Sequence, residues 1–192
     1  MADNVKTTGY PPLFLNAYIN AQLERFGLIA ESQTMLPPPF IPASVPTNIE
    51  DLYNDQIQIR GTEKPILIMY DRLTRFRPTP FYRHKREQLI YFIYTAQDET
   101  LLNIMRVITE ALDREDAAAQ DINSWLKSNP LAYAPTNVFF HNVRVYQADE
   151  SRDVVELASA KTLFVNKIII EYDYHTNDTI TIGSTSYTNI YT

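Results

Sequence analysis

Apolar residues recur at every third or fourth position in two parts of the chain, which is the spacing of a helix with one buried face. Residues 12–26 have this pattern and are followed by Gly27, a residue type that commonly ends helices. Residues 98–114 repeat it, and a second helical stretch continues to Lys127 before Pro130. We therefore predict an N-terminal helix and, in the middle of the chain, a pair of helices.

Other stretches have the patterns of β-strands. Residues 66–70 and 89–94 are apolar at every position, as in strands covered on both faces. Residues 138–147 and 160–174 are rich in β-branched and aromatic residues, and alternation over residues 168–175 predicts one wet face. Because two strand pairs flank the helix pair, we predict an α+β fold, with helices packed on one face of a mostly antiparallel or mixed sheet.

Two shorter elements are expected before the first strand pair. Thr47 and Glu50 have the spacing of a capping box, which predicts a short helix of one or two turns. Residues 57–60 alternate between apolar and polar side chains, which predicts a short strand before Gly61 turns the chain.

The length of 192 residues predicts a single domain, residues 1–192, with several appendages. We expect a flexible polar N-terminus over residues 1–11 and an extended proline-rich arm over residues 36–46. Residues 71–87 are expected to form a basic hairpin arm. The Ser- and Thr-rich tail, residues 176–192, either pairs as an added strand with a sheet edge of its own or a neighbouring chain, or frays.

The distribution of charge points to an interaction surface. The formal net charge is −6, yet six of the 17 Lys and Arg residues lie within residues 72–86, where no carboxylate occurs. Pro78 and Pro80 disfavour a regular ladder there, which favours a long projecting arm. The candidate interface consists of Arg72, Arg75, Arg77, Arg83, Lys85, Arg86, Phe76, Phe81 and Tyr82.

This basic segment has three interpretations. It is a solvated tip that protects a strand edge, a protein interface built on Arg and aromatic residues, or a surface that binds nucleic acid. The acidic net charge opposes the last of these, so we favour the protein interface. Residues 98–121 contain seven carboxylates against two arginines, so the arm of one copy would find an acidic helix on the next copy in a ring.

Enzymatic chemistry has little support in the sequence, and we predict that the protein is not an enzyme. Four glycines and no cysteine leave no phosphate-binding Gly loop, Cys-zinc site or thiol nucleophile. His84, His141 and His175 each occur singly, so we nominate no catalytic residue, cofactor site or metal ligand. Glu156 and Lys161 are the nearest candidates for a nuclease site, and their spacing matches no known pattern.

The apolar runs are far shorter than the ~20 residues that span a bilayer, and the polar first nine residues do not have the pattern of a signal peptide. We therefore expect a soluble, non-secreted protein with no membrane partner.

The order of predicted elements resembles that of the tail-terminator and neck proteins of tailed bacteriophages. The resemblance extends over about residues 12–175 and rests on architecture and not on a signature motif. Its elements are the helix of residues 13–26, the strand pair with its arm at residues 65–94, the helices of residues 98–127, and the closing strands of residues 138–147 and 160–174.

This resemblance implies a structural virion protein without catalytic residues, made in the host cytoplasm and assembled at the tail or neck. Family members form rings, commonly hexamers, that cap the tail tube, stop its growth and join it to the head connector. The basic arm would then contact tube, neighbour or connector, and some of its charge would lie near the lumen through which DNA passes. The alternative hypothesis is a DNA-binding or nuclease-type α+β protein that uses residues 72–86 on phosphates.

Overall fold

The computed structural model of the 192-residue chain describes residues 11–29, 40–43, 48–60, 66–78, 85–114, 116–130, 138–149, 152–176, 179–182 and 185–188. Within these ranges, the side chains of residues 56–60, 74–78, 116, 179–182 and 185–188 are not described. The expected flexible segment of residues 1–11 therefore lies outside the described residues, apart from Pro11, which begins the first helix.

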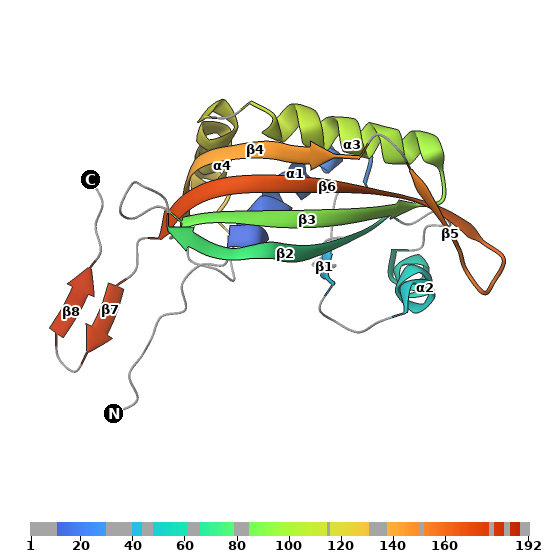
Figure 1. The fold of residues 1–192 in the computed structure, drawn as a ribbon, viewed down its shortest axis with the longest axis horizontal. Coiled ribbons are helices and arrows are strands. Elements are labelled where there is room, and N and C mark those ends of the chain that lie inside the picture. The colour runs from blue at the N-terminus through green and yellow to red at the C-terminus, as the bar shows by residue number, and fades with distance from the viewer. Residues whose placement is uncertain are drawn as a thin grey trace.

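The fold is α+β, as the sequence predicts, with a mixed sheet (Figure 1). The described helices are α1 (Pro11–Arg25), α2 (Ile49–Arg60), α3 (Asp98–Leu112) and α4 (Asp116–Ser128). The strands are β1 (Phe40–Pro42), β2 (Leu67–Pro78), β3 (Lys85–Thr95), β4 (Val138–Ala148), β5 (Asp153–Glu156), β6 (Thr162–Thr176), β7 (Thr179–Ile182) and β8 (Thr185–Thr188).

The main sheet has the strand order β1-β2-β3-β6-β4, and β5 also pairs with β6. Only the pairing of β1 with β2 is parallel among the described strands; the other ladders are antiparallel. Since β3 occupies one side of β6 along its length, β4 and β5 follow one another along the other side. β4 is therefore an edge strand.

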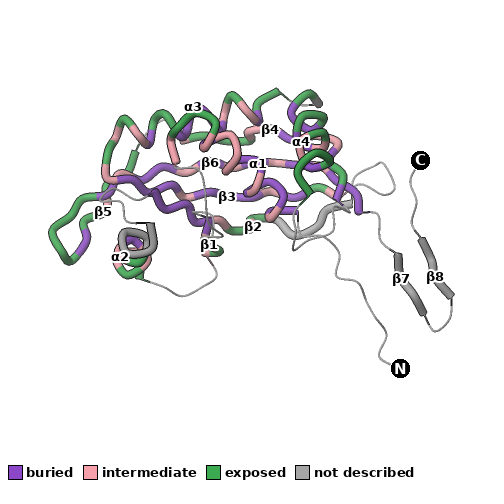
Figure 2. Tube along the Cα trace, turned by 180° about the vertical axis from the view of Figure 1, so that it is seen from behind, coloured by how far each residue is buried: buried purple, intermediate pink, exposed green. Residues whose placement is uncertain are grey.

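Helices α1, α3 and α4 cover one face of the sheet, where alternate strand residues form the main core. Phe14, Leu15 and Leu23 of α1 are fully buried, and each such side chain contributes about 1.5–3 kcal/mol. The hydroxyl of Tyr91 in β3 donates to Oδ1 of Asn16 at 2.7 Å, which fixes α1 on the sheet. The central strands β3 and β6 are buried along most of their length (Figure 2).

Helix α2 departs from the expected arrangement of helices, because it packs against the opposite face of the sheet. Tyr53 of α2 shares a second, smaller core with Leu67 of β2 and Leu163 of β6. These strand residues alternate with those of the main core, so the sheet is apolar on both faces at this end. The expectation of helices on one face thus describes α1, α3 and α4 only.

The prediction of a strand at residues 57–60 is wrong, because these residues continue α2 to Arg60. The helix also exceeds the expected one or two turns. Thr47 of the predicted capping box lies outside the described residues. At the described start of α2, the backbone N–H of Glu50 donates to Oδ1 of Asn48 at 3.1 Å. The Glu50 carboxylate accepts from the backbone N–H groups of Ala158 and Ser159, at 2.9 and 3.0 Å, and so ties α2 to the turn after β5.

The appendages are only partly described. Within the proline-rich segment of residues 36–46, Phe40 to Pro42 form β1, which adds a parallel strand to the sheet. The described part of the C-terminal tail forms a two-stranded sheet of its own, β7 with β8, and does not add to the main sheet. Strand β5 was not expected, because it lies between the predicted strands of residues 138–147 and 160–174. No helix among the described residues is long and apolar enough to cross a membrane.

Candidate interaction site at the two ends of the sheet

The ends of four strands bring the chemically distinctive residues together at one end of the sheet, which we call the arm end. Pro78 of β2 pairs with Lys85 of β3, and Lys85 pairs with Tyr174 of β6. Thr176, the last residue of β6, pairs with Val138, the first residue of β4. The basic segment, the start of the edge strand and the end of β6 are therefore neighbours.

Arg72, the first cation of the basic segment, forms a buried ion pair at the arm end. Its guanidinium donates to Oε1 of Glu87, a carboxylate of β3 that is only 1% exposed. The hydroxyls of Tyr172 and Tyr174 also donate to Glu87, each at 2.9 Å. Burial, with the nearby Glu87 charge, raises the pKa of Tyr172 well above its ordinary value. Arg72 thus stabilises a charge inside the fold, and its guanidinium is not available as a free contact.

Arg86 is also paired within the chain, on the other face of the sheet. Its Nε and a terminal nitrogen each donate to Asp173 of β6 at 2.7 Å, and this contact raises the pKa of Arg86. Next along β6, Glu171 accepts from Arg144 of β4 and from Gln88 of β3. This face therefore contains a strip of ion pairs across three strands.

The remaining predicted interface residues are described less fully. Nζ of Lys85 lies 5.8 Å from the ring centroid of Tyr174, in a cation–π contact. Arg75, Phe76 and Arg77 lie in β2, with Arg77 opposite Arg86, and only their backbone is described. The residues that lie outside the described part of the chain are Phe81, Tyr82 and Arg83. The ladder continues to Pro78 despite two register shifts, so the arm extends directly from the sheet.

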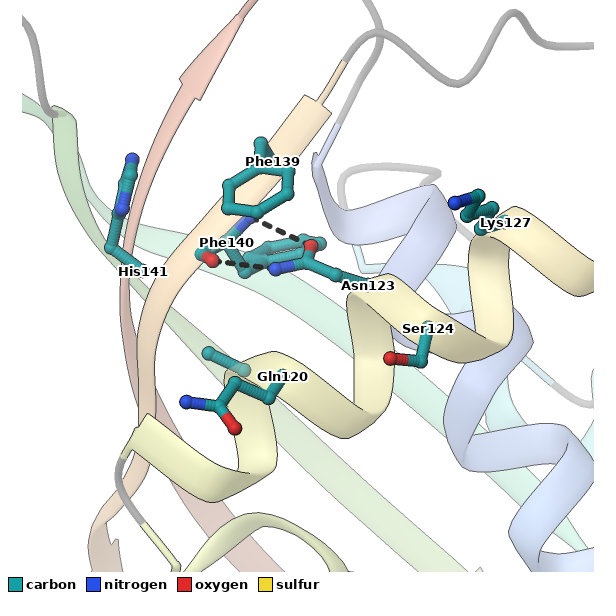
Figure 3. Close-up of a pocket in the computed structure, with 8 residues that line it drawn as sticks. Gln120, Asn123, Ser124, Lys127, Phe139, Phe140 and His141 are labelled. Atoms are coloured by element: carbon teal, nitrogen blue, oxygen red, sulfur yellow. Dashed lines mark hydrogen bonds between the residues drawn. The ribbon is translucent and has the colours of Figure 1, made fainter. Parts of the chain in front are cut away.

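A groove at the arm end separates α4 from the start of β4 (Figure 3). Its volume is about 640 Å³. At its floor the side chain of Asn123 binds the edge of β4 like a further strand: Nδ2 donates to the carbonyl of Phe140 at 2.7 Å, and the Phe140 N–H donates to Oδ1 at 3.0 Å. The residues that line the groove are Ala119, Gln120, Asn123, Ser124, Lys127, Phe139, Phe140 and His141.

Two histidines that are separate in sequence meet beside this groove. Nε2 of His141 lies 2.5 Å from Nδ1 of His175, and the ring centroids are 4.7 Å apart. The nitrogens therefore face one another along the line between the rings, as in one N–H···N hydrogen bond. Phe139 packs against both rings, with centroid distances of 5.6 and 5.4 Å. Sequence reasoning missed this cluster, because it depends on the pairing of β4 with β6.

The opposite end of the sheet, formed by α2, β5 and the start of α3, has the other sign of charge; we call it the hairpin end. Its exposed carboxylates form no ion pair with any described residue: they are Asp51, Asp55, Glu99, Asp153 and Glu156. By contrast, three of the carboxylates of residues 98–121 are paired within the chain, namely Asp98 with Arg152, Glu110 with Arg106 and Asp121 with Arg114. The available negative charge therefore lies mainly at the hairpin end.

Among the described residues, no group of three or more His, Asp or Glu side chains is placed to hold a metal ion. Glu156 lies in β5, and Lys161 precedes β6 with its Nζ 5.8 Å from the ring centroid of Tyr53. His84 lies outside the described residues. The candidate acid and base of a nuclease therefore lie far from both described histidines.

No known protein family matches this sequence, and no curated protein is significantly similar to it.

Proposed function

We propose that this protein is a structural subunit of the head-to-tail junction of a tailed bacteriophage, a ring-forming tail terminator or neck protein. In this role it caps the tail tube and joins it to the head connector, and it acts by assembly without catalysis. It would be located in the tail or neck of the virion. Its partners would be further copies of itself, commonly six in a ring, the tail-tube protein and the connector.

The observation that supports this proposal is the opposite charge of the two ends of one sheet. The arm end carries the basic segment, and the hairpin end carries exposed carboxylates without partners among the described residues. A surface at one end of a subunit that attracts the other end of the next subunit gives a head-to-tail contact, which closes into a ring when the rotation allows. The acidic partner of the arm is then the hairpin end. The carboxylates of residues 98–121 are the second candidate, and three of these seven, Asp98, Glu110 and Asp121, are already paired within the chain.

The alternative, binding of DNA by residues 72–86, receives less support. Arg72 and Arg86 already contact Glu87 and Asp173, so the segment offers fewer cations to phosphates than its sequence suggests. The two functions respond differently to salt. DNA binding falls steeply as salt rises from about 50 to 200 mM, whereas a packed protein ring persists.

A charge-reversal experiment tests the proposal. Arg75→Glu combined with Arg77→Glu is expected to prevent assembly or attachment to tail tubes, measured by sedimentation with purified tubes. The matched control, Arg106→Glu with Arg114→Glu, changes the net charge equally on the helical surface and is expected to assemble. Normal assembly of the arm variant would contradict the proposed role of the arm.

A further inference from the structure

We infer that the groove between α4 and β4 receives the β5–β6 hairpin of a second copy of this chain. This inference rests on the proposed function only in assuming that copies assemble. It identifies the contact through which the arm end of one subunit meets the hairpin end of the next.

The groove presents an apolar surface and a positive charge. The side chain of Phe139 is 46% exposed although it is large and aromatic. Among the described lining residues, Lys127 is the only one with a formal charge, and His141 is titratable. Gln120 and Ser124 from α4 add hydrogen-bonding groups on the opposite wall (Figure 3). The groove therefore suits a segment that combines an apolar side chain with carboxylates.

The β5–β6 hairpin has this combination. Val154 is 54% exposed, and the exposed residues Asp153 and Glu156 lie beside it in the same short strand. The hairpin projects beyond the sheet, with its tip exposed (Figures 1 and 2). Its turn is held by the two hydrogen bonds from the backbone to Glu50 of α2, so a partner would meet a pre-ordered element.

The length of the sheet requires the contact to be intermolecular. The groove lies beside His175, near one end of β6, whereas β5 pairs with Thr162 to Val165 at the other end. His175 lies 13 residues beyond Thr162, a distance of about 40 Å along a strand. A hairpin fixed at one end cannot reach the groove of its own chain. A second copy displaced along the strand direction places the two surfaces together.

Ion pairs and apolar burial are expected to play different roles in this contact. Exposed ion pairs such as one between Lys127 and Glu156 contribute little stability and mainly select the partner and its orientation. The burial of Val154 against Phe139 supplies the favourable area. The contact therefore has a direction, because the groove and the hairpin are different surfaces, and it propagates head to tail.

Disulfide trapping tests this contact with no interference from native thiols, because the chain contains no cysteine. Full-length protein with Ser124→Cys and Val154→Cys, concentrated under mild oxidation, is expected to give a ladder of disulfide-linked oligomers on non-reducing gels. Gln120→Cys with Val154→Cys is a second pair that allows for a small shift in register. The control, Leu102→Cys with Val154→Cys, places a thiol at another exposed position, on α3. The yield of disulfide-linked oligomers from the test pairs is expected to exceed that of the control by about tenfold, because the proposed contact raises the local concentration of the two thiols.

Mixing Ser124→Cys protein with Val154→Cys protein should give dimers, whereas neither alone should. Linkage at the level of the control in both test pairs would overturn the inference. If rings or capped tubes nevertheless form, the groove contact is wrong while the proposed function stands. If the specific ladder appears but the protein neither forms rings nor binds tubes, the contact is supported and the proposed function fails.

Discussion

Arg72 and Glu87 form an ion pair between neighbouring strands β2 and β3, at the point where the basic arm leaves the sheet. The carboxylate is buried, and two tyrosine hydroxyls complete its hydrogen bonding. The pair therefore anchors the start of the basic segment to the core.

Removal of Arg72 should destabilise the protein, because it leaves the Glu87 charge buried without its cation. We expect Arg72→Met to lower the free energy of unfolding by about 3 kcal/mol in urea denaturation. Arg72→Met combined with Glu87→Gln should lose less than the sum of the single changes. Arg106→Met, which breaks an exposed pair on α3, serves as the control and should leave the free energy of unfolding nearly unchanged. Strict additivity of the two single changes would show that the pair is not coupled.

Stability should decrease at alkaline pH, because burial raises the pKa of Tyr18, Tyr53, Tyr94 and Tyr172. Above about pH 10, the unfolded chain releases tyrosine protons that the folded protein retains, so increasing pH favours unfolding. The contribution of these tyrosines to stability is fully present below about pH 10 and is lost as the pH rises through their pKa values in the folded protein.

The variant Tyr172→Phe isolates the part of this pH dependence that comes from Tyr172, whose pKa is raised most strongly. It should be less stable than the parent at neutral pH, since it loses a hydrogen bond to Glu87, but its stability should fall less steeply above about pH 10. Urea unfolding at several alkaline pH values measures both effects. The same slope in parent and variant would exclude Tyr172 as a source of the alkaline sensitivity.

Asn123 should stabilise the edge strand β4 through its two hydrogen bonds to the backbone of Phe140. Asn123→Ala leaves the N–H and C=O of Phe140 without their partners, which should cost about 1–3 kcal/mol in unfolding free energy. Asn123→Asp keeps an acceptor for the Phe140 N–H but places an anion near the Phe140 carbonyl. This variant should therefore recover only part of the unfolding free energy that Asn123→Ala loses. Full stability of Asn123→Ala would mean that solvent replaces both bonds without loss.

The sequence predicts elements well where a local pattern decides the structure. The apolar spacing of residues 12–26 and 98–114 matches α1 and α3, and residues 138–147 match β4, each within two residues at either end. The pattern at residues 57–60 was misleading, because so short an alternation fits the end of a helix as well as a strand.

The site was harder to predict, because it depends on the register between strands. The basic segment is evident in the sequence, yet the carboxylates that meet Arg72 and Arg86 were missed. Glu87 follows the segment directly, and Asp173 lies 87 residues beyond Arg86. Likewise, the His141–His175 pair appears only once β4 is aligned with β6. The alternation over residues 168–175 gave the one available signal, since it assigned Asp173 and His175 to the same face.

Negative-stain electron microscopy of the purified protein, alone and with assembled tail tubes, tests the central claim most directly. The proposed function predicts rings, or tube ends capped by added density, that persist at moderate salt. Isolated particles that leave tube ends uncapped, and that instead bind duplex DNA in a strongly salt-dependent way, would contradict it and support the DNA-binding alternative.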